Sequence, residues 1–314
     1  MGAMSTAADN ILASQLAGIR LASPLVVASG IFGPDYAELV PGLPGVGAVI
    51  TKTITREPRS GNKEPRVVET RAGILNAIGL QNPGVHTFIA REIPKYRRLD
   101  IPVIASIAGN TIEDYRTCAT LLASLDEVRG IELNVSCPNV KNGVMFGSDA
   151  CMLEELVGIV KGCMGGKPLI VKLTPNVTDI AVPARAAIDG GANAISLINT
   201  LHGMAIDVKT QRPILGNRVG GYSGIGVHPV AVYLVHRCYT AVCRERFIPI
   251  LGLGGVATAE DALELLLAGA TCVGVGTALF RTPNVCATIA AGIATYLRDR
   301  CEESVTAIIG KAAV

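Results

Sequence analysis

A cysteine at the end of an expected buried strand is the first feature of this sequence that could do chemistry. Residues 130–139 read Gly-Ile-Glu-Leu-Asn-Val-Ser-Cys-Pro-Asn, and polar and apolar types alternate up to Cys137. A strand would therefore turn Glu132, Asn134 and Ser136 to one face, where burial is costly unless something bonds them. A buried structural cysteine is the alternative interpretation. The pattern Asn-x-x-Cys-Pro-Asn instead favours a reactive thiol that faces a ligand.

Two lysines, Lys52 and Lys172, lie within otherwise apolar strand candidates. A lysine in such a place is seldom buried without a partner. The lysines either face an anionic or electron-rich ligand or pair with carboxylates such as Glu132. Amide side chains at neighbouring strand ends favour the ligand. The residues gathered at the ends of the strand candidates are Ser29, Gly30, Thr53, Asn110, Asn134, Asn199 and Thr200.

Glycines follow the last two strand candidates, at Gly254 and Gly255 and at Gly276 before Thr277. Glycine exposes backbone N–H groups, and in barrels the loops after strands seven and eight form a phosphate cradle. Residues 252–257 also fit a dinucleotide fingerprint, but no acidic residue ends a following strand at the expected spacing. A mononucleotide phosphate therefore fits better than NAD. Residues 76–84 add Asn76 and two turn glycines, which either present N–H groups or form an ordinary surface turn.

The elements that must position these residues alternate between strands and helices. Strand candidates cover residues 25–30, 48–55, 102–109, 130–137, 169–175, 194–200, 249–256 and 272–279. Eight strands alternating with helical segments predict an α/β fold, a (β/α)8 TIM barrel with its chemistry on the loops after the strands. Residues 12–24 predict a short N-terminal hairpin. Residues 56–71 and 201–228 predict long inserted loops at the C-terminal face, typical of lids or substrate walls.

Composition excludes several classes of protein. The 314 residues are 49% hydrophobic with 35 Gly and no Trp, which suits one barrel domain over residues 1–314. A net charge of +2 without a dense basic run disfavours nucleic acid. Nine scattered cysteines without a C-x-x-C pair argue against a metal site or a disulfide framework, and favour the cytoplasm. No apolar run approaches a membrane span, and residues 1–4 read as a cloning remnant.

Together these residues resemble the class 1 dihydroorotate dehydrogenases, FMN-dependent enzymes of pyrimidine synthesis. The likeness covers nearly the whole chain and is most specific at residues 76–84, 134–141, 199–207 and 251–256. The Gln-Asn-Pro-Gly run at 81–84 and the Gly-Met-Ala-Ile-Asp run at 203–207 are similar to the NAD-linked B subgroup. That resemblance implies a homodimeric core that pairs with a separate subunit carrying FAD and a 2Fe–2S cluster, as a heterotetramer of two catalytic and two electron-transfer chains.

The resemblance also implies a role for each matched residue. Cys137 would be the base that removes the C5 proton of dihydroorotate while the C6 hydride passes to the flavin. Lys52 would lie between substrate and flavin, and Lys172 beside the flavin ring. Substrate contacts would come from Lys52, Asn76, Ile78, Gly79, Leu80, Asn134, Asn139, Asn199 and Thr200. Cofactor contacts would come from Ser29, Gly30, Lys52, Thr53, Asn110, Asn134, Lys172, Ile198, Gly224, Gly254, Gly255, Gly276 and Thr277, and no metal site is expected.

Three places depart from the family pattern. Residues 222–226 read Tyr-Ser-Gly-Ile-Gly where the family usually has Leu-Ser-Gly-Pro-Ala, which affects the flavin contact at Gly224. His202 replaces an apolar residue, and we expect a solvated loop side chain there. The loop at residues 140–147, which should cover Cys137, is about one residue short, a change that could alter lid closure without changing the chemistry.

Other functions are compatible with the same barrel. A related FMN enzyme could act on another pyrimidine or use fumarate as its acceptor. Lys172 or Lys52 could instead form a Schiff base in a lyase. A barrel that only binds a phosphorylated ligand leaves Cys137 and two inward lysines unexplained. Oxidation of dihydroorotate, with electrons passing through FMN and a partner subunit to NAD, accounts for all of these residues and is the leading hypothesis.

Overall fold

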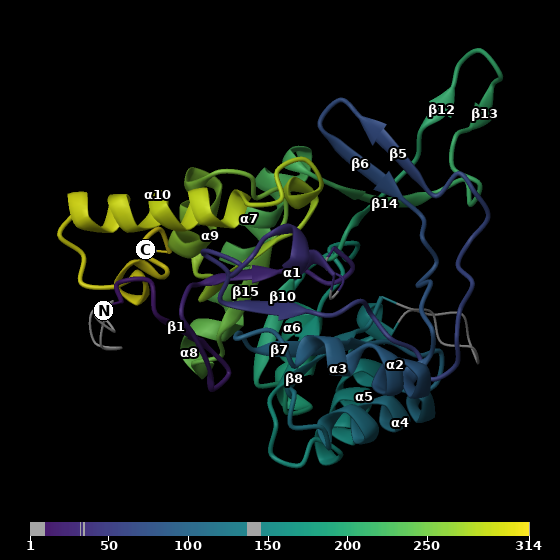
Figure 1. Cartoon of the computed structure of the whole chain (residues 1–314), viewed down its shortest axis with the longest axis horizontal. Coiled ribbons are helices and arrows are strands. Elements are labelled where there is room, and N and C mark those ends of the chain that lie inside the picture. The colour runs from purple at the N-terminus through teal and green to yellow at the C-terminus, as the bar shows by residue number, and fades with distance from the viewer. Residues whose placement is uncertain (1–9, 32, 34, 137–145, 314) are drawn as a thin grey trace.

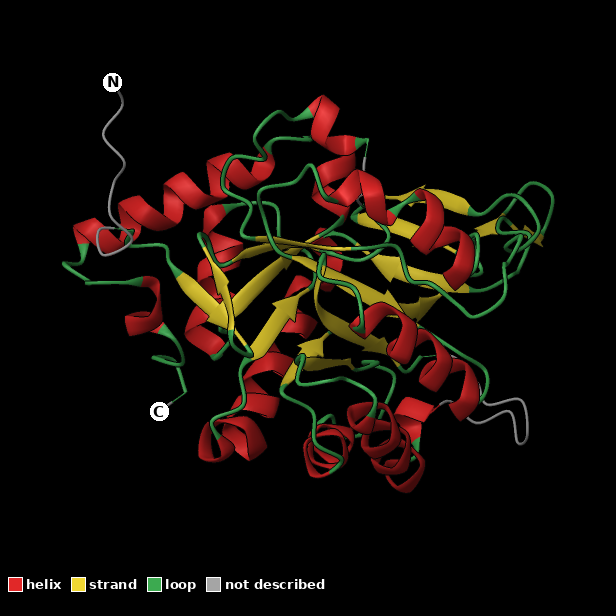
Figure 2. Ribbon diagram, turned by 60° about the horizontal axis from the view of Figure 1, so that its bottom comes forward, coloured by secondary structure: helices red, strands yellow, loops and turns green. Residues whose placement is uncertain are grey.

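A closed barrel of eight parallel strands forms the centre of the molecule. The computed structural model describes residues 10–31, 33, 35–136 and 146–313. Around the barrel the strands follow the order β10-β15-β16-β3-β4-β7-β8-β9, and helices surround them (Figures 1 and 2). Their bounds are β3 (Leu25–Val27), β4 (Ala48–Ile50), β7 (Val103–Ile107), β8 (Val128–Asn134), β9 (Leu169–Lys172), β10 (Ala194–Leu197), β15 (Ile250–Leu253) and β16 (Cys272–Val275). The predicted (β/α)8 barrel is confirmed.

Each barrel strand ends earlier than the sequence predicts. β4, for example, stops at Ile50 and β10 at Leu197, whereas the predicted strands continue to residues 55 and 200. The polar and glycine residues beyond these ends lie in loops, although some, such as Thr51 and Asn199, still donate a backbone hydrogen bond to the neighbouring chain segment. The barrel mouth is therefore lined by loop residues that sequence patterning had assigned to strands.

Alternating side chains divide the strands between two cores. Along β3, Val26 belongs to the cluster inside the barrel, whereas Leu25 and Val27 belong to the cluster beneath the helices. The predicted hairpin is present as β1 (Ser14–Leu16) and β2 (Ile19–Leu21). Leu16 and Leu21 join the inner cluster together with the first residues of β4, β10 and β16. The hairpin thus closes the N-terminal end of the barrel, which leaves the C-terminal end as the mouth.

Helices cover the outside of the barrel. The longer ones are α2 (Val85–Arg91), α4 (Ile112–Ala123), α5 (Ala150–Gly162), α6 (Ala181–Asp189), α7 (His228–Cys238), α9 (Ala259–Ala268) and α10 (Val285–Asp299). Short helices are α1 (Tyr36–Leu39), α3 (Ile93–Tyr96), α8 (Arg244–Arg246), η2 (Phe146–Ser148), η3 (Ile225–Val227), the π-helical η4 (Tyr239–Cys243), η5 (Thr277–Phe280) and η6 (Val305–Ile308). Thr258 and Asp261 form a capping box at the start of α9, as the sequence predicts. Within the described ranges no helix is both long and apolar enough to cross a membrane.

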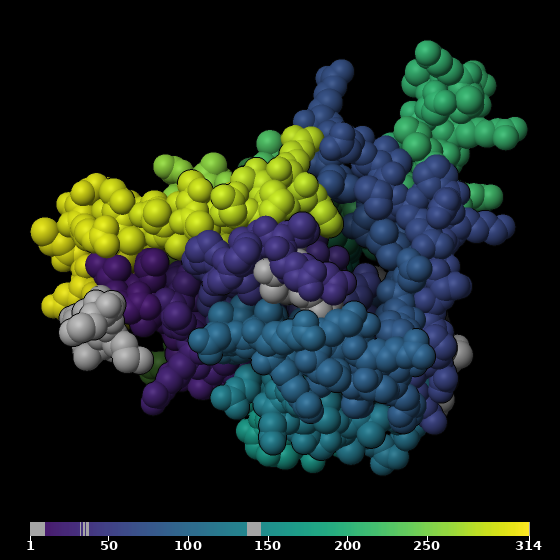
Figure 3. Space-filling view, in the orientation of Figure 1, coloured from purple at the N-terminus to yellow at the C-terminus, as the bar shows by residue number. Residues whose placement is uncertain are grey.

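The two predicted inserts are present, and short strands lie between their loop residues. β11 (Leu201–Gly203), β14 (Gly220–Ser223), β6 (Gly73–Asn76) and β5 (Val67–Thr70) form an antiparallel sheet. β12 (Ile206–Asp207) and β13 (Arg212–Pro213) form a hairpin that projects from the molecule (Figures 1 and 3). These strands are short, and β14 pairs with β6, about 145 residues away in the chain. Pairing over such a separation leaves no local sequence pattern.

Candidate active site at the barrel mouth

A fully buried carboxylate, Glu132 on β8, ends a row of hydroxyl groups that crosses the barrel. Ser106 on β7 donates a hydrogen bond of 3.2 Å to Glu132 Oε1, and Ser196 on β10 donates one of 3.2 Å to Oε2. Ser106 is in turn 3.0 Å from the hydroxyl of Thr53, which is 3.0 Å from that of Ser29. Burying a carboxylate is costly unless donors and a countercharge satisfy it. The row supplies the donors and connects five strands of the barrel.

Lys172 supplies the countercharge. Its ammonium lies 3.9 Å from Glu132 Oε1, and its side chain is 8% exposed. The interpretation that the inward lysines meet carboxylates therefore holds for Lys172. At 3.9 Å the contact is an ion pair without a direct hydrogen bond, and the Lys172 ammonium donates no hydrogen bond to any described residue. Its N–H donors remain available to a ligand at the mouth.

Lys52 has no carboxylate within ion-pair distance in the part of the chain that the structure describes. Burial lowers the pKa of Lys52 below that of an ordinary lysine, and the positive charge of Lys172 lowers it further. Gly30, with φ +86°, lies beside it, and a Cβ there would come 3.5 Å from the Lys52 ammonium. Of these two ammonium groups only that of Lys172 has a carboxylate partner among the described residues, an excess of positive charge that suits an anionic ligand.

Amide side chains meet at the ends of β8 and β10, where Asn134 lies opposite Lys172 of β9. The Asn199 amide donates to Ser136 Oγ at 2.8 Å and to Asn134 Oδ1 at 3.3 Å. The Asn199 carbonyl oxygen accepts from the Thr200 N–H at 2.9 Å. The hydroxyl of Tyr115 on α4 donates a hydrogen bond of 2.8 Å to the backbone carbonyl of Asn134. The cluster ends at Ser136, immediately before Cys137; Cys137 and Asn139 lie outside the described residues.

The antiparallel sheet brings Asn76 to the same mouth. Asn76 ends β6, and its amide donates to the Gly221 carbonyl on β14 at 3.3 Å. A Cβ on Gly221 would overlap Thr200 Oγ1 at 2.1 Å, so only glycine lets β14 approach the end of β10 this closely. The turn of Gly79 and Leu80 follows Asn76, and both residues have positive φ. Asn76 and the turn that follows it are therefore positioned by the pairing of β6 with β14 rather than by the barrel strands.

Glycine loops form the third part of the mouth. Gly254 and Gly255 follow β15, and Gly276 follows β16. Within the described part of the chain, the backbone N–H groups of these three glycines meet no acceptor. A Cβ on Gly254 would lie 3.4 Å from Ile198, and one on Gly255 would lie 2.9 Å from the Gly224 carbonyl. Backbone N–H groups without an acceptor in neighbouring loops are what a phosphate site requires, and the phosphate cradle stays a prediction here.

The sequence matches the family model of dihydroorotate dehydrogenase over residues 11–297. The chain belongs to the dihydroorotate dehydrogenase family. The catalytic subunit of dihydroorotate dehydrogenase B (NAD(+)) from Geotalea daltonii is 48% identical, over 95% of this chain and 97% of its own length. The subunit of the same name from Alkaliphilus oremlandii is 49% identical, over 94% and 97% respectively. The resemblance predicted from the motifs is confirmed.

In this member of the dihydroorotate dehydrogenase family, the structure gathers most of the predicted site residues at one end of the barrel. At strand ends, in their loops or on the adjoining inserted sheet lie Ser29, Gly30, Lys52, Thr53, Asn76, Ile78, Gly79, Leu80, Asn110, Asn134, Lys172, Ile198, Asn199, Thr200, Gly224, Gly254, Gly255, Gly276 and Thr277. Asn110 accepts a hydrogen bond from Arg59 at 2.8 Å, and Thr277 donates to Ser223 at 2.9 Å. His202 is exposed as expected, although it lies on β11 rather than in a loop.

Sequence reasoning missed two serines that bind Glu132 and one residue at the mouth. Ser106 and Ser196 are single polar residues in apolar strands, the same signal that identified Lys172, so this signal could have found them. Asn176 donates to the Thr200 carbonyl at 3.1 Å and accepts from the His202 N–H at 3.0 Å. No motif marks Asn176, because its role depends on how the β9 and β10 loops meet.

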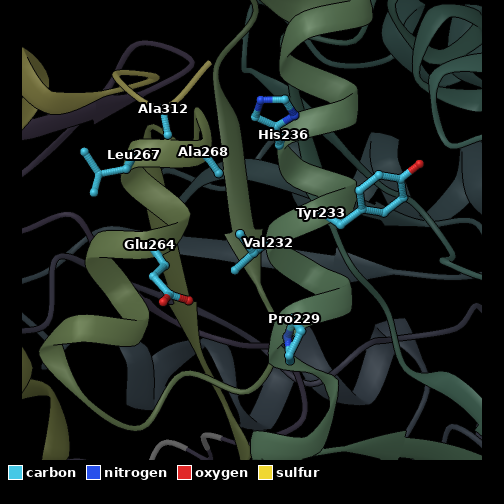
Figure 4. A pocket seen from close by; sticks show the side chains of 8 residues that line it. All are labelled: Pro229, Val232, Tyr233, His236, Glu264, Leu267, Ala268 and Ala312. Atoms are coloured by element: carbon cyan, nitrogen blue, oxygen red, sulfur yellow. The ribbon is translucent and has the colours of Figure 1, made fainter. Parts of the chain in front are cut away.

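Two cavities open away from this cluster. One, of about 380 Å³, lies between α7 and α9 and is lined mainly by apolar side chains (Figure 4). The other, of about 600 Å³, adjoins the β12–β13 hairpin. Neither is lined by a residue of the barrel strand ends, so the polar groups rather than cavity size locate the candidate site. The described residues include no group of three metal-ligating side chains.

Proposed function

We propose that this chain oxidises dihydroorotate to orotate at the barrel mouth, in the synthesis of pyrimidines. The observation that carries the proposal is that Lys52, the Asn134–Asn199 amide pair and the chain leading to Cys137 all lie at the C-terminal end of the barrel. Dihydroorotate offers a carboxylate and ring amide groups, which match an ammonium and two-sided amides. The relatives' names, dihydroorotate dehydrogenase B catalytic subunit, agree with this substrate.

In this proposal each residue of the site has a separate role. Lys52 binds the substrate carboxylate, and Asn76, Asn134, Asn139, Asn199 and Thr200 hold the ring together with the backbone of residues 78–80. Cys137 takes the proton from C5 as a thiolate, because a thiol can be tuned toward neutral pH by nearby positive charge. The chemistry that FMN supplies when bound is acceptance of the C6 hydride.

The glycine loops and the lysine pair support FMN as the cofactor. The N–H groups of Gly254, Gly255 and Gly276, which meet no acceptor among the described residues, suit a phosphate. Lys172, held by Glu132, would place a cation beside the flavin ring, where it stabilises the charge of the reduced form. Ser29, Gly30, Thr53, Asn110, Ile198, Gly224 and Thr277 would line the remainder of the cofactor.

Electrons would leave this chain through a partner subunit. The relatives are named catalytic subunits of an NAD(+) enzyme, which implies a second subunit. We propose that this partner carries FAD and a 2Fe–2S cluster and passes electrons to NAD, in a heterotetramer of two catalytic and two electron-transfer chains. The eight described cysteines are free thiols, which fits a reducing cytoplasm. The isolated chain should therefore reduce NAD poorly and regain the activity when the partner is added.

Visible spectra of the purified chain test the proposed reaction. We expect flavin absorption that bleaches when dihydroorotate is added without oxygen and stays unchanged with dihydrouracil, which lacks the carboxylate. A flavin reduced equally by both compounds would contradict the assignment of the carboxylate site. A flavin that neither compound reduces would contradict dihydroorotate as the substrate.

The affinity for orotate should fall as the pH rises. The fall should begin at a lower pH than it would if Lys52 had the pKa of an ordinary lysine. Only protonated Lys52 attracts the carboxylate, and burial together with Lys172 lowers the pKa of Lys52. The measurement is orotate affinity from flavin spectra, made in a Cys137→Ala background so that the thiol does not contribute. Lys52→Arg, which stays charged, should remove the alkaline loss. The same pH dependence in both proteins would rule out Lys52 as its origin.

The projecting β12–β13 hairpin supports a homodimeric core. Ile206 and Val208 are 57% and 83% exposed, and Met204, two residues before β12, is a further exposed apolar residue. Apolar side chains gathered on an extended arm are typical of a contact surface, and a second copy of the chain is the partner we propose. Val208→Glu should shift the protein from dimer to monomer in sedimentation. Phe247→Glu, at an exposed apolar residue after α8, is the matched control; equal behaviour of the two variants would contradict the proposed interface.

A further inference from the structure

His228, at the first position of α7, is a buried titratable residue that the proposed reaction does not use. Its Nδ1 lies 2.8 Å from the backbone carbonyl of Gly254. Its Nε2 lies 3.1 Å from a carboxylate oxygen of Glu264 on α9, with Asp261 at 3.8 Å. The ring therefore bridges the loop after β15 and the helix that follows it.

Both ring nitrogens face acceptors, which determines their roles. A carbonyl oxygen only accepts, so Nδ1 must carry a proton and donate to Gly254. The carboxylate of Glu264 fixes the other side of the ring, in the way that a carboxylate orients an imidazole in many sites. Asp261 and Glu264 are the charged groups of α9 that face the ring.

Holding the Gly254 carbonyl also orients the next N–H group. Glu64-Pro65 and Leu197-Ile198 are the cis peptides among the described residues, so the bond between Gly254 and Gly255 is trans. In a trans peptide the C=O and N–H point in opposite directions. With the Gly254 carbonyl turned to His228, the Gly255 N–H points away from the ring, and it meets no acceptor among the described residues.

Close packing against His228 restricts the backbone conformation of the loop at Gly255. A Cβ on Gly255 would approach the His228 Cβ to 2.7 Å and the His228 backbone nitrogen to 2.9 Å. Gly255 has φ +73°, in the left-handed region that favours glycine. The loop thus lies directly against the first turn of α7, where the His228 ring is the side chain that contacts its carbonyl.

We propose that His228 is a positioning residue for the flavin phosphate, which it serves by holding the Gly254–Gly255 peptide with its N–H toward the cradle. The proposal rests on the proposed function, because the phosphate belongs to FMN. Glu264 supports the ring from the cavity between α7 and α9, where its carboxylate is one of the lining groups (Figure 4). The role is orientation of a backbone donor, and His228 itself touches neither substrate nor flavin in this account.

The test compares two ligands that differ only in the phosphate. Flavin-free full-length protein is titrated with FMN and with riboflavin, and quenching of flavin fluorescence gives each affinity. His228→Phe keeps a ring and removes both N–H donors; we expect it to weaken FMN about tenfold, as loss of one charge-assisted hydrogen bond predicts, and to leave riboflavin unchanged. His228→Asn places an amide donor near the position of Nδ1 and should restore most of the preference for FMN.

A second variant keeps the test decisive if the phenylalanine protein folds poorly. His228→Gln places its amide near the position of Nε2, so it can contact Glu264 but not Gly254, and it should lose the preference for FMN. Equal weakening of FMN and riboflavin would reduce His228 to a structural role and overturn the proposal. An unchanged ratio of the two affinities in His228→Phe and His228→Gln would also overturn it. Failure of the wild-type chain to prefer FMN over riboflavin would instead overturn the proposed phosphate site itself.

Discussion

Replacing Cys137 by alanine is expected to slow reduction of the flavin by dihydroorotate by about 10²–10⁴-fold, the usual contribution of a general base. Orotate affinity should change little, because the described contacts at the mouth come from lysine and amide groups. The measurement is single-turnover bleaching of the flavin without oxygen, which separates the chemical step from the later passage of electrons to a partner.

Two further variants sharpen the test of the base. Cys137→Ser keeps a proton acceptor whose pKa is far higher, so its activity should be low at neutral pH and rise further into the alkaline range than that of the wild type. Cys151→Ala changes an exposed cysteine on α5 and should leave the rate unchanged. A Cys137→Ala protein that reduces the flavin at the wild-type rate would exclude Cys137 as the base.

Lys172→Met is expected to lower the free energy of unfolding by about 3–5 kcal/mol, the cost of removing one partner from a buried ion pair. Glu132 is fully buried, and the two serines that bind it are neutral. Without Lys172 the carboxylate loses its countercharge and must either stay uncompensated or take up a proton. Urea unfolding of flavin-free protein is the measurement, because bound flavin would add its own stabilisation.

The double variant Lys172→Met with Glu132→Gln separates charge from packing. A neutral glutamine keeps hydrogen bonds with Ser106 and Ser196 and needs no countercharge, so most of the lost stability should return. The double variant should still bind FMN more weakly than the wild type, since the cation beside the flavin ring is gone. Equal stability of Lys172→Met and the wild type would show that the 3.9 Å pair contributes nothing to folding.

The sequence predicted the barrel because its signals are local. Strand alternation such as that of residues 130–136 and the capping box at Thr258 depend on neighbours within a few residues. The same locality explains what these signals left out. The inserted sheet depends on β6 meeting β14 across the chain, and the strand ends depend on where the closed barrel stops pairing.

By itself the sequence determined which chemical groups this protein carries and at which strand ends: Lys52, Lys172, the asparagines and the glycine loops, along with the family to which they belong. The tertiary structure decided which of these groups face one another. Glu132 proved to be the partner of Lys172, 40 residues on in the chain, and His228 the support of Gly254. Barrel closure sets these distances, and residues in contact across a closed sheet have no fixed spacing in sequence.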